Sequence, residues 1–121
     1  MTSIAPLALA LVDTEPAVGA SLMRLLAQYQ EFLVYAWSGD DVSELPMIPD
    51  IVLVTPQRPE RLTELRRRCP HTYILARVPW DRDGYWNHPA LDEPLDKLAP
   101  FETVLEALLR IRRERFNADQ S

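Results

Sequence analysis

The stretch Asp50-Ile51-Val52-Leu53-Val54-Thr55-Pro56 decides the fold. It is a short, unbroken apolar run between a charged residue and a Thr-Pro pair, and most of its members are β-branched. Such a run is typical of a strand buried on both faces, in the middle of a parallel sheet. In open α/β sheets, ligands and chemistry lie beyond the carboxyl ends of the strands. Thr55 stands at that end here, so its identity bears on any reaction of the fold.

Composition limits the class of protein. The chain has 121 residues, 47% of them hydrophobic, which suits one globular domain with a single core. The formal net charge of −5 argues against direct binding of nucleic acid. The longest apolar run, residues 4–12, is too short to span a bilayer and follows no basic segment, so we expect a cytoplasmic location and no membrane contact. Cys69 is the only cysteine, which excludes an internal disulfide; we expect it to be exposed in a loop.

Apolar runs and amphipathic stripes alternate about five times, which predicts an α/β fold with a parallel sheet. The expected strands are five short segments: residues 7–12, 32–37, 51–55, 72–76 and 95–98. The expected helices follow the first three strands and the last one: residues 14–30, 42–45, 59–68 and 101–116. We expect Thr14 to cap the first helix.

Two segments carry further expectations. Residues 78–94 contain Gly84 and three prolines, so we expect one turn or an irregular loop rather than a long helix. The helix over residues 59–68 is expected to turn Leu62 and Leu65 inward and to present a basic outer face. The arginines at 66–68 are expected to be solvated.

Three motifs, in order, resemble the receiver domain of bacterial response regulators. Val12-Asp13-Thr14-Glu15-Pro16 looks like the family's Val-Asp-Asp-Glu-Pro, and residues 49–55 look like its Pro-Asp-Leu-Val-Leu-Leu-Asp. Lys97, followed by the last helix, looks like its Lys-Pro-Phe. The resemblance covers nearly the whole chain. It implies one flavodoxin-like (βα)5 domain over residues 1–121, with strand order 2-1-3-4-5, a short third helix, a degenerate fourth helix, and a tail or linker start at residues 116–121.

The departures from the family pattern fall on the residues that carry its chemistry. The family's third-strand aspartate accepts a phosphoryl group, and this chain has Thr55 there. The family's second acid after the first strand binds Mg²⁺, and this chain has Thr14 there. The switch Ser or Thr of the fourth strand corresponds to Ala76. The resemblance therefore implies a degenerate phosphorylation pocket: Asp13, Thr14, Thr55, Ala76 and Lys97.

This pocket lacks the groups that phosphoryl transfer needs. Mg²⁺ prefers oxygen ligands that include one or two carboxylates, and a threonine hydroxyl is a poor nucleophile without an adjacent base. We therefore expect no metal, no cofactor, no catalytic residue and no enzymatic activity. Thr55 is expected to be a strand residue whose hydroxyl bonds to backbone, because β-branched residues suit strands. Asp13 and Lys97 are expected to form an ion pair in place of the metal; the alternative is that each is solvated.

The leading hypothesis is a pseudo-receiver that acts without phosphorylation, through protein–protein interaction or dimerisation, in bacterial signal transduction or transcription control. In the family, the face of the fourth helix, fifth strand and fifth helix commonly serves this role. The candidates for binding a protein partner or a second copy here are Trp80, Tyr85, Trp86, Leu95 and Arg112. The alternative for the three aromatic residues is that they fill the space of the missing fourth helix.

Two other hypotheses stay open. One is a phosphoryl-accepting receiver with a relocated, Mg²⁺-dependent site built on Asp13. The other is a sensor that binds a small molecule in the vacated pocket.

Overall fold

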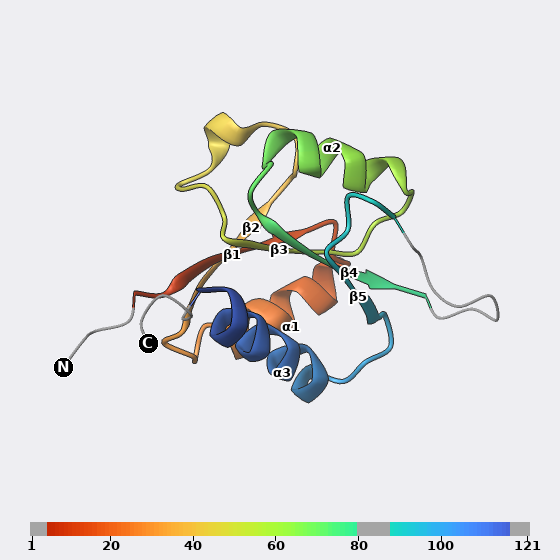
Figure 1. Cartoon of the computed structure of the whole chain (residues 1–121). Helices are drawn as coiled ribbons and strands as arrows, with labels where there is room; N and C mark the ends of the chain where they lie inside the picture. Colours follow the sequence, from red (N-terminus) through yellow and green to blue (C-terminus); the bar gives the residue numbers. More distant parts are fainter. Residues whose placement is uncertain (1–4, 80–87, 117–121) are drawn as a thin grey trace.

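Five parallel strands form one sheet in the order β2-β1-β3-β4-β5 in the computed structural model, which describes residues 5–79 and 88–116 (Figure 1). The strands are β1 (Leu7–Val12), β2 (Phe32–Trp37), β3 (Ile51–Val54), β4 (Tyr73–Val78) and β5 (Glu93–Asp96). The expected receiver-type α/β fold and its strand order are confirmed.

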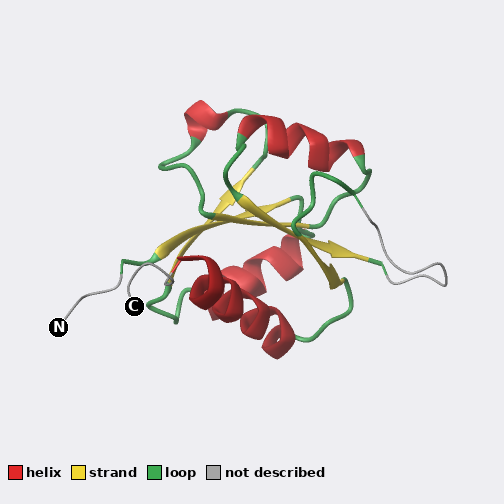
Figure 2. Cartoon of the chain, viewed as in Figure 1, coloured by secondary structure: helices red, strands yellow, loops and turns green. Residues whose placement is uncertain are grey.

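Helices cover both faces of the sheet, but unequally. The helical elements are α1 (Pro16–Leu26), the 3-10 turn η1 (Val42–Glu44), α2 (Glu60–Arg68), α3 (Phe101–Ile111) and the π-helical turn η2 (Arg112–Phe116). Helices α1 and α3 lie on one face, and α2 lies on the other (Figure 2). Only η1 connects β2 to β3, so α2 is the single long helix on its face among the described residues. None of the described helices has the length and apolar character needed to cross a membrane.

The alternation of side chains along the buried strands divides the core in two. Leu9 and Leu11 of β1 belong to the cluster that packs against α1 and α3. Ala10 and Val12 belong to the cluster on the side of α2. Every residue of β1 and β3 is buried, as expected for central strands of a parallel sheet.

An aspartate precedes β3 and another precedes β5, and each accepts a backbone hydrogen bond from the neighbouring strand, β1 or β4. Asp50 Oδ2 accepts a hydrogen bond from the backbone N–H of Ala8 at 2.8 Å. Asp92 Oδ2 accepts one from the N–H of Ile74 at 2.7 Å. Each carboxylate accepts from a backbone N–H that lies just before the hydrogen-bonded pairing of the two strands begins, and so helps to set the strand register.

Several element boundaries differ from the expectation; the last helix, for example, is α-helical only to Ile111 and continues as the π-helical turn η2. Glu15 is the N-cap of α1 and no side chain caps this helix, so the role expected of Thr14 is wrong. The helix ends at Leu26 rather than near residue 30, because hydrogen bonds from Tyr29 to Leu26 and from Phe32 to Tyr29 turn the chain into β2. Strand β5 begins two residues before the expected start and includes Pro94, which an edge strand tolerates.

Candidate functional site

The carboxyl ends of β1 and β3 bring Asp13 and Thr55 to the same edge of the sheet. The N–H of Thr55 donates to the carbonyl of Val12 at 3.2 Å. Asp13 has a φ of 57°, in the left-handed region, which aspartate tolerates better than most residues. The two positions thus lie at adjoining strand ends, as the family pattern implies.

The guanidinium of Arg61, on helix α2, contacts the carboxylate of Asp13. Arg61, at the second position of α2, places Nε 2.7 Å from Asp13 Oδ2 and Nη2 3.4 Å from Oδ1. Its side chain is only 12% exposed. A two-point contact between a guanidinium and a carboxylate is a strong, directional hydrogen-bonded pair. The expected pair of Asp13 with Lys97 is therefore wrong, because Arg61 engages both oxygens of Asp13.

Arg61 also joins the ends of β2 and α2. Its Nη1 lies 3.1 Å from Asp40 Oδ1 and 3.1 Å from Glu64 Oε2, and its Nη2 donates to the carbonyl of Ser38. Burial alone lowers the pKa of the guanidinium, but the hydrogen bond and charge of Asp13 and the hydrogen bonds of Glu64 and Asp40 raise that pKa above its ordinary value. The cation is therefore permanent. We call Asp13, Ser38, Asp40, Arg61 and Glu64 the Arg61 cluster.

The Arg61 cluster requires a glycine at position 39. Gly39 has a φ of +82°, a conformation that residues with a side chain rarely adopt. A Cβ at this position would also collide with the guanidinium of Arg61. Both the backbone and the space around it therefore disfavour a larger residue.

Lys97 pairs with Glu15 instead of Asp13. Its Nζ lies 3.8 Å from Glu15 Oε1, and the two side chains are 41% and 63% exposed. An ion pair this exposed contributes little to stability. Lys97 is therefore held at the sheet edge mainly by its backbone N–H, which donates to the carbonyl of Val78 at 2.8 Å.

The other pocket positions have no polar role in the site. A Cβ on Gly19 of α1 would come within 2.6 Å of Thr14 Oγ1, so the side chain of Thr14 lies against that helix. Ala76 is fully buried, is paired with Val54 and belongs to the core cluster on the side of α2.

Thr55 is buried, and its hydroxyl has no hydrogen-bond partner among the described residues. The residue is 4% exposed. The expectation that this hydroxyl bonds to backbone is therefore wrong. A nucleophilic hydroxyl needs an adjacent base, and none of the described side chains hydrogen-bonds to Thr55 to serve as one.

The residues of this pocket do not fit Mg²⁺, the metal that the family pattern implies. Both oxygens of Asp13 contact Arg61, and threonines stand at positions 14 and 55, where the family has carboxylates. Within residues 5–79 and 88–116, no cluster of three or more His, Cys, Asp or Glu residues could hold a metal ion. The guanidinium of Arg61 places a positive charge beside the carboxylate of Asp13.

The sequence contains a signal for the position of Arg61. The helix over residues 59–68 is expected to present a basic outer face, but Arg61 precedes Leu65 by four residues, and residues at this spacing share one side of a helix. Leu65 is fully buried, so the spacing places Arg61 near the sheet as well. Residues 38–41 are expected to break the second strand and to cap a short helix over residues 42–45, and Asp41 does cap η1 by accepting a hydrogen bond from the N–H of Ser43.

Arg66 and Arg68 of α2 are also anchored rather than solvated. Arg66 donates to the carbonyls of Thr72 at 2.7 Å and Ala90 at 3.1 Å, and it pairs with Asp92 at 2.5 Å. Arg68 Nε donates to the carbonyl of Asp40 at 2.7 Å. Long cationic side chains that satisfy free carbonyls become part of the fold.

Cys69 is 2% exposed, contrary to the expectation of an exposed loop thiol. It packs in the core cluster on the side of α2, and burial raises the pKa of its thiol. A buried thiol with a raised pKa is a poor nucleophile.

The expected interaction face is only partly described. Leu95 lines a groove of about 510 Å³ between β5 and α3, together with Leu109 of α3. Arg112 is 5% exposed and donates to the carbonyls of Ala5 and Glu31, so its assignment to an exposed face is wrong. The predicted interaction residues Trp80, Tyr85 and Trp86 lie outside the described residues.

Solved structures of receiver domains share this fold. The BeF3-activated DrrB receiver domain superposes with a TM-score of 0.69 at 17% identity, over 90% of this chain and 99% of that one. A signal receiver domain of an HD domain-containing protein from Pseudomonas fluorescens Pf-5 gives 0.69 at 20% identity, over 96% and 98%. An adenylate cyclase from Rhodopirellula baltica gives 0.68 at 16% identity, over 87% and 86%. No family model and no curated protein matches the sequence. The likeness shows the receiver-type fold.

Two buried threonines allow a matched test of the unpaired hydroxyl. Thr55→Val should leave the free energy of unfolding unchanged or raise it, because an unpaired hydroxyl is replaced by a methyl group of the same shape. Thr72→Val should lower it by about 1–3 kcal/mol, because Thr72 donates to the Pro49 carbonyl at 2.7 Å. Urea denaturation measures both. An equal loss in the two variants would show that Thr55 has a partner.

The close approach of Gly39 and Arg61 predicts a coupling between them. Gly39→Ala should lower the free energy of unfolding by about 1–3 kcal/mol through its positive φ and its clash with the guanidinium. In an Arg61→Ala background the same change should cost less, because only the φ strain remains. A double-mutant cycle by chemical denaturation measures the difference. Equal costs in both backgrounds would contradict the contact.

Proposed function

We propose that this chain is a receiver-like signalling module that works without phosphorylation, as a pseudo-receiver in bacterial signal transduction. The observation that carries the proposal is the two-point contact of Arg61 with Asp13. This contact supports a pocket in which the cation beside Asp13 is the side chain of Arg61 rather than a metal ion.

The chemistry of the pocket argues against the phosphoryl-accepting alternative. Enzymatic phosphoryl transfer depends on a metal cation and on a positioned acceptor. A metal ion would have to displace a guanidinium that contacts three carboxylates, and the acceptor position holds a threonine with no base beside it. A relocated acceptor at Asp13 would first have to break its pair with Arg61. The geometry therefore favours a pocket that stays in one state.

A pocket fixed in one state suits a constitutive binding module. Switching by phosphorylation requires a group that is added and removed and that biases two conformations. Arg61 is always present and always charged, so it holds the ends of β1 and β2 against α2 at all times. We propose that signalling output comes from docking.

The groove between β5 and α3 supports docking of a second copy. Leu95 and Leu109 give it an apolar part, and exposed charges of both signs line it. Glu106 and Arg113 lie seven residues apart, about two helical turns, and neither makes an ion pair within the described residues. A surface with unpaired charges of both signs can be complementary to itself across a two-fold axis.

Phosphorylation is tested by intact-mass analysis after incubation with acetyl phosphate and Mg²⁺. We expect no phosphoryl adduct, because Arg61 engages Asp13 and Thr55 lacks a base. A receiver domain that retains the acceptor aspartate, treated in parallel, should be labelled. Labelling of the wild-type chain at Asp13 or Thr55 would contradict the proposal.

Dimerisation is tested by charge reversal. Glu106→Arg and Arg113→Glu should each weaken self-association roughly tenfold, because like charges would meet across the two-fold axis. The double variant should restore it. Sedimentation equilibrium measures the dissociation constants, and Glu102→Arg, exposed on the same helix but outside the groove, is the control. A monomeric wild-type chain, or a double variant as weak as the singles, would refute this interface.

A further inference from the structure

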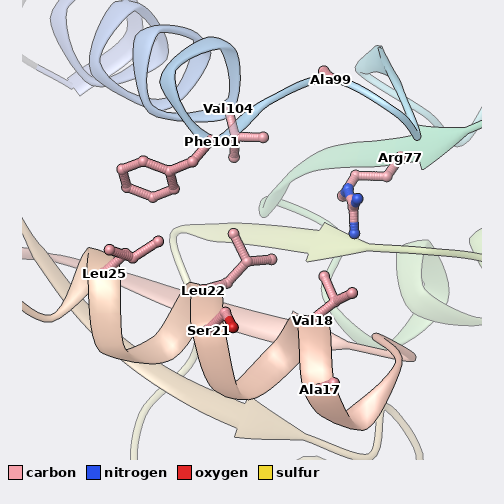
Figure 3. Close-up of a pocket in the computed structure, with 9 residues that line it drawn as sticks. All are labelled: Ala17, Val18, Ser21, Leu22, Leu25, Arg77, Ala99, Phe101 and Val104. Carbon is pink, nitrogen blue, oxygen red and sulfur yellow. The ribbon is translucent and has the colours of Figure 1, made fainter.

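A second cavity lies on the opposite face of the sheet from the Arg61 cluster. It has a volume of about 320 Å³ and lies between α1, along most of its length, and the first turn of α3 (Figure 3). Its walls are apolar side chains of both helices: Val18, Leu22 and Leu25 from α1, and Phe101 and Val104 from α3. This volume falls in the range of small-molecule sites, and apolar walls are typical of them.

One cation points into this apolar cavity. The side chain of Arg77 extends from β4 toward Val18 and Leu22 of α1 (Figure 3). Its Nη2 donates to the carbonyl of Lys97 at 2.7 Å, while its Nε is buried and has no acceptor among the described residues. No described carboxylate lies within 4.0 Å of the guanidinium, and no acidic residue lines the cavity. In the described part of the chain, the charge of Arg77 is therefore uncompensated.

The two helices reinforce this positive potential. Both α1 and α3 begin at this edge of the sheet, and Ala17 and Phe101 of their first turns line the cavity. Neither N-cap, Glu15 or Pro100, makes a side-chain hydrogen bond to the free N–H groups of its helix. Helix N-termini carry partial positive charge, which Glu15 at the N-cap of α1 and Glu102 in the first turn of α3 offset in part, so the guanidinium of Arg77 is the main positive charge at the cavity.

We infer that this cavity binds a small organic monocarboxylate with an apolar, ring-sized body. The single guanidinium matches one carboxylate, with which arginine forms charge-assisted hydrogen bonds. The walls of Leu22, Leu25 and Phe101 match an apolar body, which gains by leaving water. The lining of this site differs from the degenerate phosphorylation pocket: none of Asp13, Thr55, Ala76 and Lys97 lines it, and the two are joined only by the hydrogen bond from Arg77 to the Lys97 carbonyl. Binding of such a ligand would regulate the chain without phosphorylation.

The first experiment compares a charged probe with a neutral one of the same shape. Titration of the ¹⁵N-labelled chain with 3-phenylpropionate should shift the amide resonances of residues around the cavity, such as Ser21 and Phe101. The neutral 3-phenylpropanamide should bind roughly tenfold more weakly, because it cannot form the charge-assisted bond to Arg77. Equal binding of the two probes, or shifts away from these residues, would overturn the inference.

Variants with matched controls separate the charge from the cavity. Arg77→Gln should weaken binding of 3-phenylpropionate roughly tenfold, whereas Arg24→Gln, which removes an exposed charge of α1 outside the cavity, should not. Ala17→Trp should block the cavity from its exposed rim, and Ala20→Trp, exposed on the same helix but outside the cavity, should leave binding unchanged. Thermal unfolding shows that each variant folds. Wild-type affinity in both Arg77→Gln and Ala17→Trp would refute the site.

Discussion

The ion pair of Arg61 with Asp13 is the contact on which one face of this molecule depends. This ion pair links α2 to the end of β1. Arg61 also contacts Asp40 and the Ser38 carbonyl, and these contacts link the same helix to the end of β2. The connection from β2 to β3 contains only η1, so no long helix packs there. On this face the polar contacts of α2 therefore add to the apolar packing of Leu62 and Leu65, whereas on the other face two helices, α1 and α3, lie together (Figure 1).

Arginine is the residue suited to this task. Its planar guanidinium offers five N–H donors, so one side chain can satisfy several carboxylates and carbonyls at once. Arg66 does this at the other end of α2, where it joins the Thr72 and Ala90 carbonyls to Asp92. Burying such charges costs desolvation energy, and pairing only partly offsets it. The arginines of α2 therefore fix the arrangement of the strand ends more than they add to stability.

The sequence predicts the sheet well because its signals are local. The β-branched run at residues 51–54 and parallel strand ends suffice to place Thr55 beside the end of β1. It predicts the partners of charged residues poorly, because these depend on packing between distant elements. Asp13 and Arg61 are 48 residues apart, and Arg112 is buried against the Ala5 carbonyl, 107 residues away. Helical spacing could place Arg61 near the sheet, but it could not choose Asp13 over Asp40.

Arg61 and Arg77 show how one fold can treat two partly buried cations in opposite ways. Three carboxylates surround Arg61, so its charge is compensated and its donors have acceptors in the chain itself. Arg77 has a carbonyl partner and apolar neighbours, so in the described residues its charge is not compensated. An uncompensated charge in an apolar cavity attracts an external anion for the same reason that it costs energy when left alone. The compensated face thus resists a ligand, while the opposite face of the same sheet favours one.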